Sequence, residues 1–104
     1  MNVTKTFVAT AALSLVTGSV IAEEMTIVSW GGAYSKSQLN AYHNPYSAKT
    51  GVTILNDDSS STAVAKLRAM NEANNVTWDV VDVEAGPAMQ LCDEGLAMVI
   101  DPDT

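Results

Sequence analysis

Three short loops carry the side chains of this chain that are best suited to binding a small molecule. Each loop follows a run of residues typical of a buried β-strand and leads into a helical pattern. In an open parallel sheet, ligands bind at the carboxyl ends of the strands. We therefore expect the loops to form one edge of the sheet, here called the rim, made of residues 30–34, 57–61 and 84–86.

The first loop of the rim contains Trp30 followed by Gly31 and Gly32. Two glycines allow backbone amides to approach a ligand closely, and an indole ring offers a face for stacking or a cation–π contact. Two alternatives stay open. Trp30 could instead belong to the core while the glycines only make the turn, and the Tyr34 hydroxyl could point to a cleft or pack on the sheet.

The other two loops offer hydroxyl and carboxylate groups. The polar run 57–61 could donate hydroxyls to a ligand, or it could be a solvated turn that caps the next helix. Asp82 and Glu84 lie on one face of a strand because side chains alternate with period two. They could hold an amine, form salt bridges with Lys66 or Arg68, or take part in acid–base chemistry.

Motifs for catalysis or metal binding are absent from the sequence. It contains no Gly-x-Ser-x-Gly elbow, phosphate loop or His/Cys cluster, and Asp57-Asp58 lacks the spacing of a calcium loop. His43 is the only histidine, and we expect it at the surface or at a helix end. We therefore predict no catalytic residue, no metal, no cofactor and no enzymatic activity.

Strand and helix patterns alternate along the chain. This alternation predicts an α/β fold with a parallel sheet in β-α-β-α-β-α-β order. The predicted strands are 26–30, 52–55, 78–83 and 96–100. The helical patterns lie between Gly32 and Gly51 with a kink or two abutting helices at Pro45, from Ser61 or Thr62 to about Ala73, and from Gly86 to Gly95.

Residues 1–22 have the pattern of a secretory signal peptide. Lys5 supplies the positive charge, residues 7–16 are apolar, and cleavage is expected after Ala22. The apolar stretch is shorter than the roughly 20 residues that cross a bilayer. A buried N-terminal helix is the alternative. We expect residues 23–104 to be exported and to form a piece of a larger domain, or else a complete four-stranded domain.

Charge and cysteine content narrow the function further. The chain has 12 acidic and 5 basic residues and a formal net charge of −7 at pH 7. This balance disfavours binding to nucleic acid or to anionic lipid, and it suits a cationic ligand. Cys92 is the only cysteine, so no disulfide can form within the chain.

Several stretches, taken in order, resemble the polyamine-type extracellular solute-binding proteins, which are periplasmic receptors of spermidine/putrescine ABC importers. These stretches are residues 27–34, 45–52, 66–67, 78–84 and 92–95. The resemblance implies a two-lobed type II periplasmic-binding-protein fold that closes on its ligand and then docks on an inner-membrane permease. It also implies a monomer and places residues 23–104 in part of the N-terminal lobe of a solute-binding domain. If Cys92 forms a disulfide, its partner would have to lie beyond Thr104.

By position, the resemblance also implies which residues bind the ligand, a polyamine or a related small cationic or polar solute. They are Trp30, Gly31, Gly32, Tyr34, Ser60, Ser61, Glu84 and Ala85. The second lobe of such receptors has no counterpart in this sequence, so we expect the 104-residue chain alone to bind weakly. Two other hypotheses stay open: a small exported flavodoxin-like enzyme that uses Asp82 and Glu84, and a truncated product without function.

Overall fold

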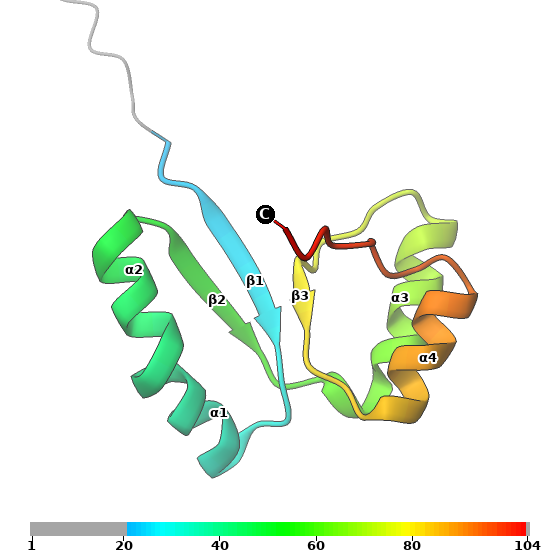
Figure 1. The fold of residues 1–104 in the computed structure, drawn as a ribbon, viewed down its shortest axis with the longest axis horizontal. Helices are drawn as coiled ribbons and strands as arrows, with labels where there is room; N and C mark the ends of the chain where they lie inside the picture. Colours follow the sequence, from blue (N-terminus) through cyan, green and yellow to red (C-terminus); the bar gives the residue numbers. More distant parts are fainter. Residues whose placement is uncertain (1–20, 104) are drawn as a thin grey trace, which may run out of the picture.

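A parallel sheet of three strands organises the chain in the order β2-β1-β3 (Figure 1). The computed structural model describes residues 21–103, so most of the expected signal peptide lies outside the described residues. The strands are β1 (Glu24–Val28), β2 (Thr53–Asp57) and β3 (Val80–Val81). Val28 is paired with Asp57 on one side and with Val81 on the other. The α/β class and the parallel sheet are confirmed, and the three carboxyl ends meet at one edge.

Three helical segments follow one another without a loop between Gly32 and Thr50. The sequence predicts a kink or two abutting helices at Pro45, near the junction of the last two segments. Pro45 lies in the first turn of a helix, where its missing N–H costs no intrahelical bond, and a π-helical turn precedes it. Gly51 ends the stretch in a left-handed conformation with φ 78°. The elements are α1 (Gly32–Gln38), the π-helix η1 (Leu39–His43) and α2 (Asn44–Thr50).

His43 lies at a helix end, as the last residue of η1, but it is buried and not at the surface. Its side chain is 7% exposed, and its Nδ1 atom lies 2.8 Å from Oδ1 of Asn56 in β2. A buried ring nitrogen needs a hydrogen-bond partner, and the amide of Asn56 provides one. This contact fixes the end of η1 against the sheet.

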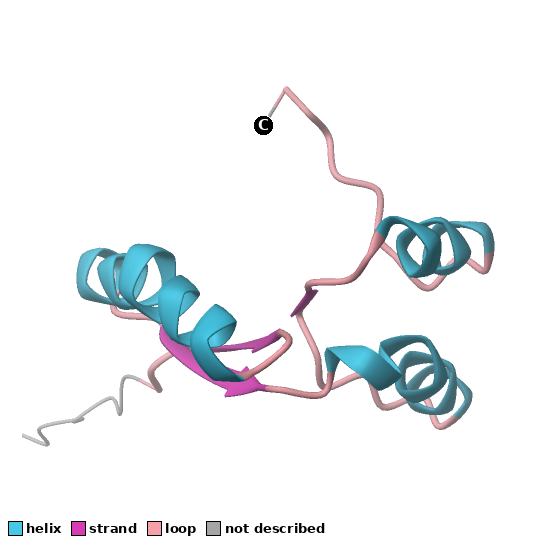
Figure 2. Cartoon of the chain, turned by 90° about the horizontal axis from the view of Figure 1, so that it is seen from below, coloured by secondary structure: helices cyan, strands magenta, loops and turns pink. Residues whose placement is uncertain are grey.

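The remaining helices lie beside β3. The short 3₁₀ helix η2 (Ser60–Thr62) leads into α3 (Ala63–Glu72), and α4 (Ala85–Asp93) packs next to α3 (Figure 2). Arg68 of α3 pairs with Glu94 just after α4, and Nε of Arg68 lies 2.6 Å from Oε2 of Glu94. This ion pair links α3 to the end of α4.

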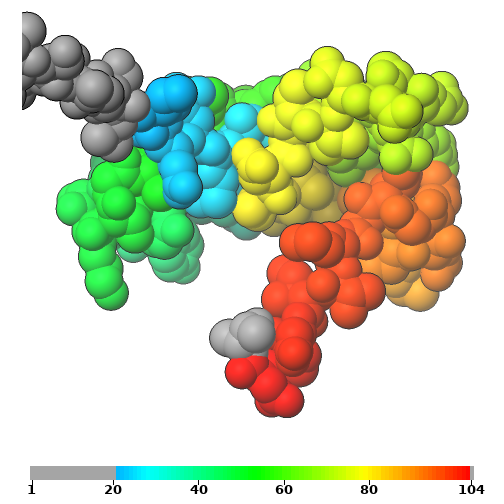
Figure 3. All heavy atoms as spheres, turned by 90° about the horizontal axis from the view of Figure 1, so that it is seen from above, coloured from blue at the N-terminus to red at the C-terminus, as the bar shows by residue number. Residues whose placement is uncertain are grey.

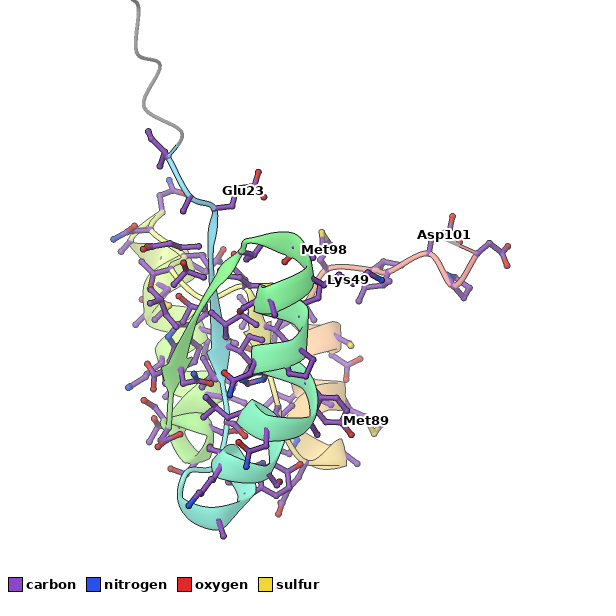
Figure 4. All side chains as sticks on the ribbon, turned by 90° about the vertical axis from the view of Figure 1, so that its left-hand side faces the viewer. Glu23, Lys49, Met89, Met98 and Asp101 are labelled. Atoms are coloured by element: carbon purple, nitrogen blue, oxygen red, sulfur yellow. The ribbon has the colours of Figure 1, made fainter. Side chains whose placement is uncertain are left out.

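The core is small and lies between the sheet and the helices. Val28 is fully buried, and Ala63, Leu67 and Leu91 are less than one-tenth exposed. Met89 and Cys92 of α4 are exposed, and Met89 projects into solvent (Figure 4). No helix within residues 21–103 is long and apolar enough to cross a membrane.

The fourth predicted strand does not form. Residues 96–100 contain no strand, and Met98, Val99 and Ile100 are between 78% and 93% exposed. The segment projects from the body of the molecule as an arm (Figure 3). An apolar hollow of about 450 Å³ separates it from β3, α3 and α4. A strand needs a hydrogen-bonded neighbour, and an apolar run alone does not supply one.

Candidate functional site

Backbone hydrogen bonds draw the loops of the rim together. The Ser29 amide donates to the Asp57 carbonyl (2.8 Å), and the Ser60 amide donates to the Ser29 carbonyl (3.1 Å). The Asp82 amide donates to the Val28 carbonyl across 2.9 Å. These bonds extend the ladder beyond the strands, so all three loops start from one rigid edge.

The first loop turns sharply and exposes its aromatic residues. Gly31 and Gly32 have φ values of +85° and +56°, a region that favours glycine. Trp30 is 40% exposed and Tyr34 is 50% exposed. Trp30 is therefore not a core residue, and its indole ring is accessible to a ligand at the rim.

Behind this turn, Ser35 connects the first loop to the second. The Ser35 hydroxyl accepts a hydrogen bond from the Gly31 amide and donates one to Oδ1 of Asp58, both at 2.8 Å. A Cβ atom on Gly31 would lie 3.3 Å from the Asp58 side chain. Close approach as well as positive φ thus requires glycine here.

Asp82 is the polar centre of the site. Oδ2 of Asp82 accepts from Nε2 of Gln38 at 3.0 Å, and the Ser29 hydroxyl lies 3.4 Å away. The Ser29 hydroxyl also donates to Oε1 of Gln38 across 2.6 Å. A hydrogen bond to the Asp82 carboxylate, together with its negative charge, raises the pKa of Tyr34 above its usual value.

In the second loop, one predicted site residue faces inward. Ser60 is 3% exposed, and its hydroxyl donates to the Asp82 carbonyl. Ser61 is exposed. The Ser59 hydroxyl donates to Asp57 and lowers the pKa of that carboxyl. The hydroxyls of Ser59 and Ser60 thus hold the loop in shape, and the loop contains no side-chain cap for η2 or α3.

The third loop leaves its carboxylate exposed. Glu84 and Ala85 are exposed at the start of α4, and Glu84 makes no side-chain capping bond. The salt bridges considered for Asp82 and Glu84 are not formed with Lys66 or Arg68. Arg68 pairs with Glu94, and the Lys66 ammonium lies 5.5 Å from the ring centre of Trp78.

Four residues that support the site were not among the predicted ligand-binding residues. They are Ser29, Ser35, Gln38 and Asp58. Ser35 and Gln38 follow Gly31 by four and seven residues, which places them on one face of a helix. This spacing could have identified Ser35 and Gln38 from the sequence as residues that face the site. Within residues 21–103, no group of three or more His, Cys, Asp or Glu side chains is arranged to hold a metal ion.

A parallel sheet flanked by helices, with loops gathered at the strand ends, is typical of proteins that bind small molecules at that edge. Residues 41–104 match the family model described as bacterial extracellular solute-binding protein. This match covers more than half of the chain, and the chain belongs to that family.

Two relatives extend the match toward the N-terminus. The chain is 35% identical over 80 residues to the gamma-aminobutyric acid-binding protein of Pseudomonas aeruginosa, covering 77% of this chain and 22% of the relative. It is 34% identical to AgtB of A. tumefaciens R10, solved in complex with agropinic acid. That structure superposes with a TM-score of 0.71, covering 80% of this chain and 26% of AgtB.

The chain thus spans about a quarter of the length of the relatives it matches. The resemblance to solute-binding proteins is confirmed at the level of the family. The names of these two relatives give gamma-aminobutyric acid and agropinic acid, and neither names a polyamine. The eight predicted ligand-binding residues remain a prediction.

Proposed function

We propose that this chain forms one wall of the solute site in a periplasmic receptor for an ABC importer, and that the solute carries an ammonium group. The observation that carries this proposal is the composition of the rim. Trp30 and Tyr34 are half-exposed in the first loop, Tyr34 interacts with the Asp82 carboxylate, and Glu84 is exposed on the neighbouring loop.

The chemistry of these groups favours a cation. An exposed indole attracts an ammonium group to its face, and carboxylates neutralise its charge. The formal net charge of −7 adds a long-range attraction for cations. Polyamines and gamma-aminobutyric acid both contain a primary ammonium group. We therefore retain putrescine and spermidine as candidate solutes and add gamma-aminobutyric acid, which one relative is named for.

The rim alone would leave a bound ligand exposed, because Trp30 and Tyr34 are open to solvent. In our proposal the rim is therefore only one wall of the pocket. Sites for small ligands bury most of the ligand surface, so a second wall is needed for tight binding. In our proposal this wall comes from a second lobe that closes on the first. The length of the relatives supports this arrangement, since the matched part is 22% and 26% of them.

Membership of an extracellular solute-binding family supports export to the periplasm through the signal peptide expected at residues 1–22. The same membership supports a binding role without catalysis. By the family resemblance, we propose that the receptor acts as a monomer and delivers its solute to an inner-membrane permease.

Calorimetric titration of the protein, purified as its host exports it, tests this function. Putrescine, spermidine and gamma-aminobutyric acid are the probes. We expect binding of at least one amine and a loss of about tenfold or more in affinity on Trp30→Ala, because cation–π contacts contribute about 1–2 kcal/mol when desolvated. Tyr46→Ala, which removes a half-exposed aromatic side chain of α2 beside the first residues of β1, is the control.

A second variant pair tests the charge. Glu84→Gln removes the exposed carboxylate of the third loop, and Asp93→Asn removes an exposed carboxylate at the other end of α4. We expect weaker amine binding only with Glu84→Gln. Equal binding by all variants, or the absence of amine binding by the wild-type protein, would contradict the proposed function.

A further inference from the structure

We propose that Ser35 and Asp58 are positioning residues that set the shape of the Trp30-Gly31-Gly32 turn, and that Asp58 acts through this geometry rather than through its charge. This inference rests on the proposed function, since it assigns a role within the same solute site. It separates Asp58 from Glu84, which we expect to contact the ammonium group directly.

The hydroxyl of Ser35 uses both of its hydrogen-bonding capacities inside the protein. Ser35 is 6% exposed. Its single proton is donated to Oδ1 of Asp58, which turns a lone pair toward the Gly31 amide. The Ser35 amide also donates to the Gly31 carbonyl across 3.2 Å. Gly31 is therefore held through both its N–H and its C=O by one residue of α1.

Asp58 contacts both Ser35 and the Gly31 backbone. The Cβ, Cγ and Oδ2 atoms of Asp58 all lie 3.3 Å from the position that a Cβ atom of Gly31 would occupy. The Gly31 backbone, with φ 85° and ψ −176°, is thus in contact with both Ser35 and Asp58. A carboxylate acceptor strengthens the bond from Ser35, because charge-assisted hydrogen bonds are the stronger ones.

These contacts affect the orientation of Trp30, which lies two residues after the end of β1. Trp30 immediately precedes Gly31, so a change in the Gly31 dihedral angles would rotate the indole ring relative to the rim. Of the two neighbouring aspartates, Asp57 is bonded to Ser59 and Asp58 to Ser35.

Four variants test whether Asp58 positions the turn or binds the ligand. Ser35→Ala removes the bridging hydroxyl, and Ser35→Thr restores it. Asp58→Ala removes the acceptor, and Asp58→Asn keeps an amide oxygen that accepts from Ser35 while removing the charge. Ser37→Ala is the matched control, since Ser37 lies in α1 but its hydroxyl donates to the Tyr34 carbonyl. Putrescine and gamma-aminobutyric acid are titrated at a temperature where each variant is folded.

We expect Ser35→Ala and Asp58→Ala to weaken binding by about tenfold, the effect of one buried hydrogen-bonding group left without its partner. Ser35→Thr, Asp58→Asn and Ser37→Ala should remain near the wild-type affinity. If Asp58→Asn loses as much affinity as Asp58→Ala, the charge of Asp58 is required and the positioning role is wrong. Failure of Ser35→Thr to restore binding would contradict the role of the hydroxyl.

Hydrogen exchange of the Gly31 amide, followed by NMR without any solute, separates this inference from the proposed function. Ser35→Ala should raise the Gly31 exchange rate by about tenfold, and Ser37→Ala should leave it unchanged. If the wild-type protein binds no amine, the proposed function fails, but the exchange result still tests whether Ser35 holds the Gly31 amide. Unchanged Gly31 exchange in Ser35→Ala would overturn this positioning role even where amine binding is observed.

Discussion

The side-chain amide of Gln38 donates to Oδ2 of Asp82 across 3.0 Å, which joins the last residue of α1 to the segment that follows β3. The two residues are 44 positions apart in the sequence. This bond, with the Ser29 hydroxyl beside it, fixes the carboxylate on which the polar part of the site depends.

Asp82→Asn should lower the pKa of Tyr34 toward the ordinary value for a phenol. The Asp82 carboxylate raises this pKa because a nearby negative charge disfavours the phenolate. Titration of the tyrosinate absorbance should therefore show one tyrosine ionising at lower pH in the variant. Tyr34→Phe assigns the signal and Tyr46→Phe serves as the control. The same titration curve for wild type and Asp82→Asn would contradict the assigned contact.

Gly31→Ala should destabilise the fold by about 1–3 kcal/mol, the cost of a side chain in a backbone region that is almost restricted to glycine. The new Cβ atom would also press on Asp58 at 3.3 Å. Urea unfolding measures the loss. Gly86→Ala in α4 is the matched control, because no atom lies within 4 Å of its Cβ position and alanine favours a helix. Equal effects of the two substitutions would show that the turn is not constrained.

Val28→Ala should cost about 2 kcal/mol of unfolding free energy, because Val28 is fully buried at the centre of the small core. Val99→Ala removes the same atoms from a side chain that is 93% exposed, so it should change stability by less than about 0.5 kcal/mol. Chemical denaturation of both variants checks this. A similar loss from both would mean that residues 96–100 are packed in solution.

Ser59→Ala should reduce the loss of stability in acid. The Ser59 hydroxyl lowers the pKa of Asp57 in the folded state, so this carboxyl stabilises the fold above its unfolded pKa of about 3.9. That contribution disappears as the pH falls through the lower folded pKa. Urea midpoints between pH 2 and 6 should show a shallower decrease for Ser59→Ala than for Ser61→Ala. Parallel pH profiles would contradict this linkage.

Local patterns predicted most of the fold. β1 lies two residues before the predicted run 26–30, and β2 extends two residues beyond the predicted run 52–55. The left-handed stop at Gly51 and the start of α4 near Gly86-Pro87 follow from nearby residues. β3 is shorter than predicted, although the Asp79 and Asp82 amides still donate to Thr26 and Val28 of β1. Strand length depends on the partner strand, which is distant in sequence, and so a local pattern overestimates it.

The same limit explains the errors at residues 96–100 and His43. The apolar run 96–100 has the composition of a strand, but strand formation requires a neighbour that no local pattern specifies. His43 is buried by its contact with Asn56, 13 residues away. The rim loops were predictable because strand ends in a parallel sheet share one edge, whereas the Ser35–Asp58 bond depends on side-chain geometry.

The strand order β2-β1-β3 has a consequence for how the chain acquires its structure during synthesis. β1 is made first but lies in the middle, so it has no hydrogen-bonded neighbour until Thr53–Asp57 has emerged, and its second neighbour arrives only with Val80. Contacts between distant segments form slowly because the intervening loop must close first. The three-stranded sheet therefore cannot be complete until Val81 has been synthesised.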